Sequence, residues 1–166
     1  MKIFILDDRE ENLEAAREAL SQYGEIFTAT SFVEGQRLVN EIKPDLAFVD
    51  KNFPNSNGEE ESNLGEKFRD EVLFPMCIPT AIVTGGINHG QQSAYITSGV
   101  LTTMGLNVIR ETQTLPGVEK THKESWEAAY QHIISKPFDI YVSAWIFSRE
   151  MKRNLSSLRK ALGRIA

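Results

Sequence analysis

The stretch DLAFVDKNFP, residues 45–54, holds a short apolar run that ends in Asp50 and turns at Pro54. Three similar runs lie elsewhere in the chain, each followed by polar or turn residues: KIFIL (2–6), PTAIVTGG (79–86) and HIISKP (132–137). In a fifth run, EIFTAT (25–30), apolar and polar residues alternate more. Short, largely apolar runs are typical of parallel strands that are covered on both faces. We therefore predict five strands.

Apolar residues recur at helical spacing between these runs. One set follows Asn12, a second precedes the helix-breaking Pro44, and a third surrounds Phe68 (Leu13, Ala16, Leu20; Phe32, Gly35, Leu38, Val39, Ile42; Leu64, Phe68, Val72). HKESWEAAYQ (122–131) is also typical of a short helix leading into HIISKP. The alternation of strand and helix predicts an α/β fold with a five-stranded, doubly wound parallel sheet.

Two segments depart from this pattern within what we expect to be one domain, residues 1–166. Residues 85–120 contain six of the eleven glycines, mixed with β-branched residues. They predict short strands or irregular loop, and we interpret residues about 87–120 as an insertion that enlarges the connection between strands four and five. A stripe of apolar residues spaced three and four apart predicts a long last helix over about 139–164. Both a homodimer through this helix or the insertion, and packing of the helix onto the insertion, stay open.

The composition is that of an ordinary globular protein, with 41% hydrophobic and 25% charged residues. A single cysteine, Cys77, excludes an intrachain disulfide and a multi-cysteine metal site. The net charge is −5, but residues 149–166 hold six Lys/Arg against one acid, which leaves an acidic body that argues against nucleic acid as its main partner. No apolar run is long enough for a signal peptide or a membrane span, so we expect a cytoplasmic protein without a membrane partner.

Polar residues follow four of the predicted strands where each one ends. Asp7 and Asp8 follow the first, Asp50 the third, Thr84 the fourth and Lys136 the fifth. Functional groups of parallel α/β sheets gather beyond the carboxyl ends of the strands, so these side chains are expected to converge. Three close carboxylates repel one another unless a cation compensates, and an all-oxygen site suits Mg²⁺.

Such a group of side chains suits phosphoryl transfer to a carboxylate. A metal ion, a hydroxyl and a lysine can neutralise a phosphoryl group, and the remaining carboxylate can serve as the nucleophile that forms an aspartyl-phosphate. Each residue alone has a plainer explanation, as a turn residue, a helix cap or a surface lysine. Their joint occurrence at successive strand ends favours the functional interpretation.

Four segments resemble the receiver domain of two-component response regulators: KIFILDDREENLEAAREAL, KPDLAFVDKNFPNSNG, IPTAIVTGG and IISKPF. The resemblance covers residues 1–86 and 130 to about 150, and it implies a flavodoxin-like fold. It also implies a phosphoryl donor that is a histidine kinase or phosphotransfer protein, and it implies the following residue roles. Asp50 would be the phosphoacceptor, Thr84 the switch hydroxyl and Lys136 the phosphate-binding lysine, while Mg²⁺ would be held by Asp7, Asp8, Asp50 and the backbone carbonyl of Asn52.

The chain departs from the family at two points. Thr84 and Lys136 are 52 positions apart, and Ile133 stands where the family has an aromatic switch residue. We predict a stand-alone receiver, not a turnover enzyme, in which phosphorylation of Asp50 switches a face that binds an unknown downstream protein. One alternative is a pseudo-receiver that binds partners without phosphorylation. Another is a haloacid dehalogenase-type phosphatase, because LDDREENLEAA resembles one of its acidic motifs, although Arg9 stands where that family has a second aspartate.

Overall fold

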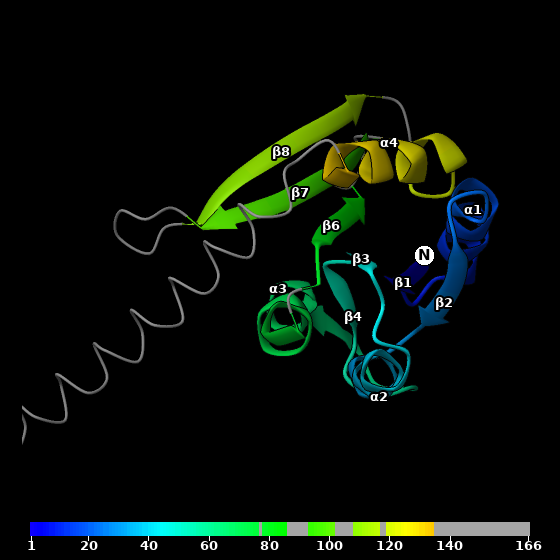
Figure 1. The fold of residues 1–166 in the computed structure, drawn as a ribbon. Helices are drawn as coiled ribbons and strands as arrows, with labels where there is room; N and C mark the ends of the chain where they lie inside the picture. Colours follow the sequence, from blue (N-terminus) through cyan, green and yellow to red (C-terminus); the bar gives the residue numbers. More distant parts are fainter. Residues whose placement is uncertain (77, 86–92, 102–107, 117–118, 135–166) are drawn as a thin grey trace, which may run out of the picture.

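The computed structural model describes residues 1–76, 78–85, 93–101, 108–116 and 119–134 (Figure 1). Strands and helices alternate from β1 to β3, and the described residues of the second half include two long strands and a helix. In chain order the elements are β1 (Lys2–Leu6), α1 (Glu10–Leu20), β2 (Glu25–Ala29), α2 (Phe32–Ile42), β3 (Leu46–Val49), β4 (Asn52–Pro54), β5 (Glu61–Asn63), α3 (Gly65–Phe68), the π-helix η1 (Arg69–Leu73), the 3₁₀ turn η2 (Phe74–Met76), β6 (Thr80–Gly85), β7 (Ser93–Leu101), β8 (Val108–Pro116) and α4 (Lys123–Ile134).

The main sheet has the strand order β2-β1-β3-β6-β7-β8. Its first four strands are parallel, as predicted, with Leu6 of β1 opposite Val49 of β3. The prediction of five parallel strands is wrong, because β7 takes the fifth position and runs antiparallel to β6. β8 then pairs antiparallel with β7. Residues 87–120, which we interpret as an insertion, thus contribute two strands of nine residues to the sheet.

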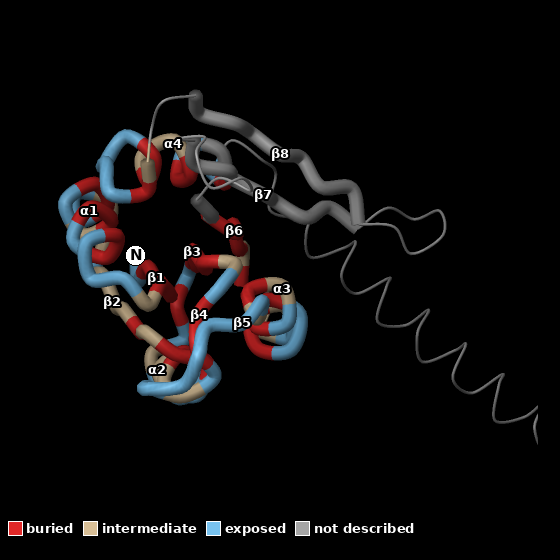
Figure 2. Tube along the Cα trace, turned by 180° about the vertical axis from the view of Figure 1, so that it is seen from behind, coloured by how far each residue is buried: buried red, intermediate tan, exposed pale blue. Residues whose placement is uncertain are grey.

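Alternate side chains of the parallel strands enter two cores on opposite faces of the sheet. Ile3, Ile5 and Phe48 face a cluster that includes α1 and α4. Phe4 and Leu6 face the cluster formed with α2, α3 and η1. Figure 2 shows β1 and β3 coloured mostly as buried, with helices on either side of them. This burial on both faces explains why the strands are nearly continuous apolar runs.

Helix α4 corrects the prediction of a fifth strand at HIISKP. Its residues 132–134 belong to the helix, and residues 135–137 lie outside the described part of the chain. Trp126, Ala129, Tyr130 and Ile133 are buried in one core cluster, which is the spacing of a helix face. A short apolar run cannot by itself distinguish a strand from a helix end, so packing against α1 decided the conformation. Ile133 is therefore a core residue of α4 and not a strand residue beside the site.

The other helix predictions are confirmed for the first half of the chain. α1, α2 and the α3–η1 segment cover the three apolar patterns, and α2 ends at Ile42 just before Lys43 and Pro44. The acidic segment after β3 forms a small hairpin of β4 and β5. The predicted last helix, 139–164, lies outside the described residues. None of the described helices combines the length and apolar character needed to cross a membrane.

Candidate functional site

Three aspartates meet at the carboxyl edge of the parallel strands. Asp7 directly follows β1 and Asp50 directly follows β3, and the register of the two strands places them side by side. The Asp50 backbone N–H donates a 2.7 Å hydrogen bond to the Leu6 carbonyl, which extends the ladder to this edge. Asp7, Asp8 and Asp50 each place one carboxylate oxygen within 4.8 Å of the others. The predicted convergence of these carboxylates is confirmed.

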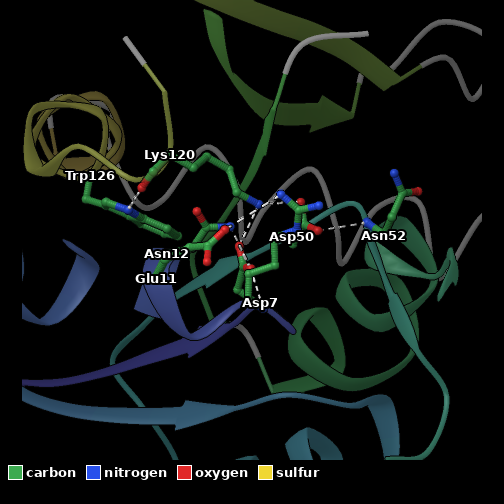
Figure 3. A network of polar contacts seen from close by, with 8 residues as sticks. Asp7, Glu11, Asn12, Asp50, Asn52, Lys120 and Trp126 are labelled. Carbon is green, nitrogen blue, oxygen red and sulfur yellow. Dashed lines mark hydrogen bonds and ion pairs between the residues drawn. The ribbon is translucent and has the colours of Figure 1, made fainter. Parts of the chain in front are cut away.

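A buried lysine joins two of these carboxylates, and it is Lys120. Its Nζ lies 2.5 Å from Asp7 Oδ2 and 2.7 Å from Asp50 Oδ1. Asp7 is fully buried, and Asp50 and Lys120 are each 7% exposed. Figure 3 shows the Lys120 side chain reaching from the turn before α4 to the two carboxylates. The ammonium therefore lies inside the acidic cluster, shielded from solvent.

Sequence reasoning missed Lys120 and named Lys136, which lies outside the described residues. The phosphate-binding role of Lys136 stays a prediction. The available signal was the position of Lys120 between a β-rich segment and the helix 122–131. Helix α4 packs against α1 in the core cluster on one face of the sheet. This packing brings the turn before α4 to the carboxyl edge of the strands, where Asp7 lies.

Two further predicted residues lie at the same edge. Thr84 lies on β6, two residues beyond Ile82, which is paired with Val49 of β3. Asn52 opens β4, and its backbone N–H donates a 3.3 Å hydrogen bond to Asp50 Oδ2. The roles of the Thr84 hydroxyl and of the Asn52 carbonyl stay predictions.

Asp7 is held by groups from the start of α1. Its Oδ1 accepts hydrogen bonds from the Asn12 side-chain amide, at 2.9 Å, and from the Arg9 backbone N–H, at 3.1 Å. Asn12 is itself buried. With Lys120 on Oδ2, both oxygens of Asp7 are engaged, so this carboxylate is fixed in place (Figure 3). Asn12 is a positioning residue that the sequence analysis did not identify.

The charges of the cluster do not balance. Burial raises the pKa of Asp50, and Asp7 raises it further, while Lys120 opposes the shift. Burial lowers the pKa of Lys120, but Asp50 and Asp7 outweigh it, so that pKa is raised and the ammonium stays charged. Among the described residues, the cluster holds three carboxylates and one ammonium, which contacts Asp7 and Asp50, so an excess of negative charge is left there. An additional cation would relieve this excess.

A fourth acid, Glu61 of the β4–β5 hairpin, reaches Asp8. Burial and then the Glu61 carboxylate raise the pKa of Asp8 to about 6. Glu61 lies in the acidic segment NSNGEEESNLG, residues 55–65, which follows β3. The hairpin pairing of Pro54 with Glu61 brings it back to the edge of the sheet.

We expect Glu61→Gln to lower the pKa of Asp8 toward its ordinary value, because the repelling carboxylate is removed. NMR titration of the side-chain carboxyl carbons in metal-free protein measures this change. Since folding raises this pKa, Asp8 favours the folded state at low pH, and that contribution is lost as the pH rises through about 6. The fall in unfolding free energy between pH 4 and 6 should therefore become shallower in the variant.

Glu60→Gln is the matched control, since it removes an equal charge from the neighbouring position. It should leave the pKa of Asp8 unchanged, because Glu60 is not among the groups that shift it. An unchanged Asp8 titration in Glu61→Gln would show that Glu61 does not raise this pKa and would leave burial and the Asp7 charge as its causes.

The loop that carries Asp50 is closely covered by the start of α3. A Cβ atom added at Gly65 would lie 2.2 Å from the Asp50 carbonyl oxygen and 2.8 Å from Lys51 Cα. The Gly65 backbone N–H donates a 2.9 Å hydrogen bond to the Lys51 carbonyl. Only a glycine allows the two backbones to approach this closely, so Gly65 helps to fix the position of Asp50.

The residues present fit a magnesium ion. The donors at the cluster are carboxylate oxygens, which Mg²⁺ prefers, and the site carries excess negative charge. Asp8 is the least buried of the three aspartates, so an ion could reach the cluster from solvent at Asp8. Asp7, Asp8 and Asp50 are the side chains that would hold the ion.

The strand order β2-β1-β3-β6 corresponds to the first four positions of the flavodoxin-like order, in which ligands bind beyond the carboxyl ends of the strands. The cluster of Asp7, Asp8 and Asp50 lies at that edge. The fold is receiver-like. The antiparallel strand β7 distinguishes it from a sheet with five parallel strands.

No family model and no curated protein matches the chain. Among five matching solved chains is a response regulator receiver domain protein from Clostridium thermocellum, with 25% sequence identity and a TM-score of 0.39. The match covers 54% of this chain and 66% of that one, which is just under two thirds of its length. A TM-score of 0.39 is too low to transfer the role of any residue from that protein to this chain.

Proposed function

We propose that this chain is a receiver that accepts a phosphoryl group on Asp50. The observation that carries the proposal is the Lys120 ammonium, buried between Asp7 and Asp50 inside an acidic cluster. A lysine fixed against an aspartate can neutralise the charge of a phosphoryl group that arrives there. The excess negative charge beside it supports a Mg²⁺ site formed by the three aspartates.

In this proposal an Asp50 carboxylate oxygen attacks the phosphorus atom of the donor. A new P–O bond forms, and the bond from phosphorus to the donor's leaving group breaks, so that the leaving group departs with the electron pair. Lys120 neutralises charge on the phosphoryl oxygens, and Asn12 keeps Asp7 in place. A bound Mg²⁺ would supply further charge neutralisation on those oxygens. Thr84, at the same edge, is proposed as the hydroxyl that responds to the new group.

The proposed donor is a histidine kinase or phosphotransfer protein, and the proposed location is the cytoplasm. The chain would act as a phosphoacceptor and not as an enzyme that turns over a separate substrate. Phosphorylation would bias the face formed by Thr84, residues 85–130 and the predicted last helix between two arrangements, one of which binds a downstream protein. Strands β7 and β8 give this face a surface that a sheet of parallel strands alone would not have.

A second candidate is a pseudo-receiver that binds partners without phosphorylation. The Lys120 ammonium bridges Asp7 and Asp50, so the chain itself supplies a cation to these two carboxylates. The two candidates differ in whether Asp50 can be modified.

We expect intact-mass measurement after incubation with acetyl phosphate and Mg²⁺ to show a gain of one phosphoryl group. Asp50→Asn should abolish the gain, because the nucleophile is lost, whereas Asp70→Asn should retain it, since Asp70 is a half-exposed residue of η1 paired with Arg69. Omission of Mg²⁺ should reduce the gain strongly. A wild-type protein that takes up no phosphoryl group would favour the pseudo-receiver.

A further inference from the structure

The turn that carries Lys120 is fixed by two side chains of α4. Ser125 Oγ donates a 2.7 Å hydrogen bond to the Glu119 carbonyl, and Trp126 Nε1 donates one of 2.7 Å to the Lys120 carbonyl. These carbonyls belong to the two peptide groups on either side of the Lys120 Cα atom. Holding both peptide planes fixes φ and ψ of Lys120, and with them the direction in which its side chain leaves the backbone.

Trp126 also contacts the strand that presents Asp50. Its ring is fully buried and packs edge-to-face against Phe48 of β3, with ring centroids 6.3 Å apart. Phe48 lies two residues before Asp50. The Trp126 side chain therefore packs on the strand that leads to Asp50 and also donates a hydrogen bond to Lys120. Figure 3 shows this hydrogen bond.

Lys120 needs such support because it belongs to a turn and not to a strand or helix. A lysine has a flexible four-carbon stem, so a small change at its backbone displaces the ammonium by a larger distance. The lysine must also compensate two buried carboxylates at 2.5 and 2.7 Å. Such close contacts require a rigid backbone beneath the lysine side chain. Helix α4 provides this support because it packs on α1.

We propose that Trp126 and Ser125 are positioning residues that place the Lys120 ammonium against Asp50. The inference rests on the proposed function of Asp50, and it adds that the start of α4 controls the reactivity of the site. Neither residue touches the phosphoryl group. Both act through Lys120, and that dependence can be measured.

Trp126→Phe removes the N–H donor and keeps an aromatic ring in the core. We expect the rate of Asp50 phosphorylation by acetyl phosphate to fall roughly fivefold, which corresponds to the loss of one hydrogen bond. Ser125→Ala should lower the rate in the same direction, and alanine is well tolerated inside a helix. Leu20→Val, a substitution in the same core cluster at the far end of α1, is the control for a general loss of packing. It should leave the rate unchanged.

A double-mutant cycle separates positioning from a general structural effect. In a Lys120→Met background, Trp126→Phe should cause no further loss of rate, because the group on which Trp126 acts is absent. A structural defect would instead lower the rate by the same factor in both backgrounds. Equal factors in both backgrounds, or an unchanged rate in both Trp126→Phe and Ser125→Ala, would overturn the proposal.

Calorimetric titration with Mg²⁺ gives a readout that does not depend on phosphorylation. A displaced ammonium competes less with the metal for Asp7, so Trp126→Phe and Ser125→Ala should bind Mg²⁺ more tightly, whereas a loosened site would bind it more weakly. If the wild-type protein is not phosphorylated, the proposed function fails, but this titration still tests the positioning. Weaker Mg²⁺ binding in both variants would overturn the positioning inference alone.

Discussion

A Lys120→Met variant is expected to lose about 100-fold in the rate of Asp50 phosphorylation, because it lacks the fixed cation at the transferring group. Its affinity for Mg²⁺ should rise by about tenfold, since removal of a nearby positive charge leaves the carboxylates free for the metal. The free energy of unfolding of metal-free protein at pH 7 should fall by about 3 kcal/mol, because buried carboxylates lose their partner. Phosphorylation kinetics, calorimetry and urea denaturation measure the three effects.

Two lysine variants serve as controls for this prediction. Lys123→Met makes the same substitution three residues later, in an exposed pair with Glu18, and should change none of the three quantities measurably. Lys136→Met tests the lysine that the sequence favoured. It should retain phosphorylation, because Lys120 already fills the place beside Asp50. A Lys136→Met protein that loses phosphorylation while Lys120→Met retains it would contradict the assignment of Lys120.

A Lys120→Met/Asp50→Asn double variant tests the origin of the stability loss. If the loss comes from an uncompensated buried charge, neutralising Asp50 should restore part of the free energy of unfolding. If it comes from lost packing of the lysine stem, the double variant should be no more stable than Lys120→Met.

A Gly65→Ala variant is expected to lose about 3 kcal/mol of unfolding free energy, at the upper end of the usual range for overpacking. The added methyl group would collide with the Asp50 carbonyl oxygen and Lys51 Cα, which are backbone atoms and cannot rotate away. Relief of the clash requires the loop after β3 to move, so Asp50 phosphorylation should fall as well. Chemical denaturation and phosphorylation kinetics are the two measurements.

Gly58→Ala is the matched control for Gly65→Ala. Gly58 has a φ of +90° in the β4–β5 turn, but a Cβ atom there would meet no neighbour within 4 Å. Its substitution should cost about 1 kcal/mol through backbone strain and leave the phosphorylation rate unchanged. Equal losses of rate in the two variants would mean that Gly65 has no specific effect on Asp50.

The sequence was sufficient to predict the parallel strands of the core and the aspartates that meet at their carboxyl ends. Each of the first four strands is a short apolar run with a polar end, and the intervening helices show clear stripes such as Leu13, Ala16 and Leu20. Parallel strands joined by helices bring their carboxyl ends to one edge, so the meeting of Asp7, Asp8 and Asp50 follows from the pattern alone. Local periodicity and chain connectivity carry this information.

The second half of the chain was harder to predict because its local signals are ambiguous. HIIS (132–135) is as apolar as a strand and as short as the end of a helix, and burial of Ile133 beside Trp126 decided for the helix over residues 132–134. The glycine-rich segment after Thr84 indicated strands, but it did not reveal their length or that β7 would pair antiparallel with β6. Pairing between distant residues decided both features.

The sequence by itself determined the fold class and the aspartates, because these depend on periodicity within segments and on the order of the segments. Only the tertiary structure decided which basic and acidic side chains join them. Lysines also occur at many other positions of the chain, and Glu61 is one of three successive glutamates. Packing of Trp126 on Phe48 brings Lys120 to Asp50, and the β4–β5 hairpin brings Glu61 to Asp8. Such contacts between residues distant in the chain leave no local pattern from which to predict them.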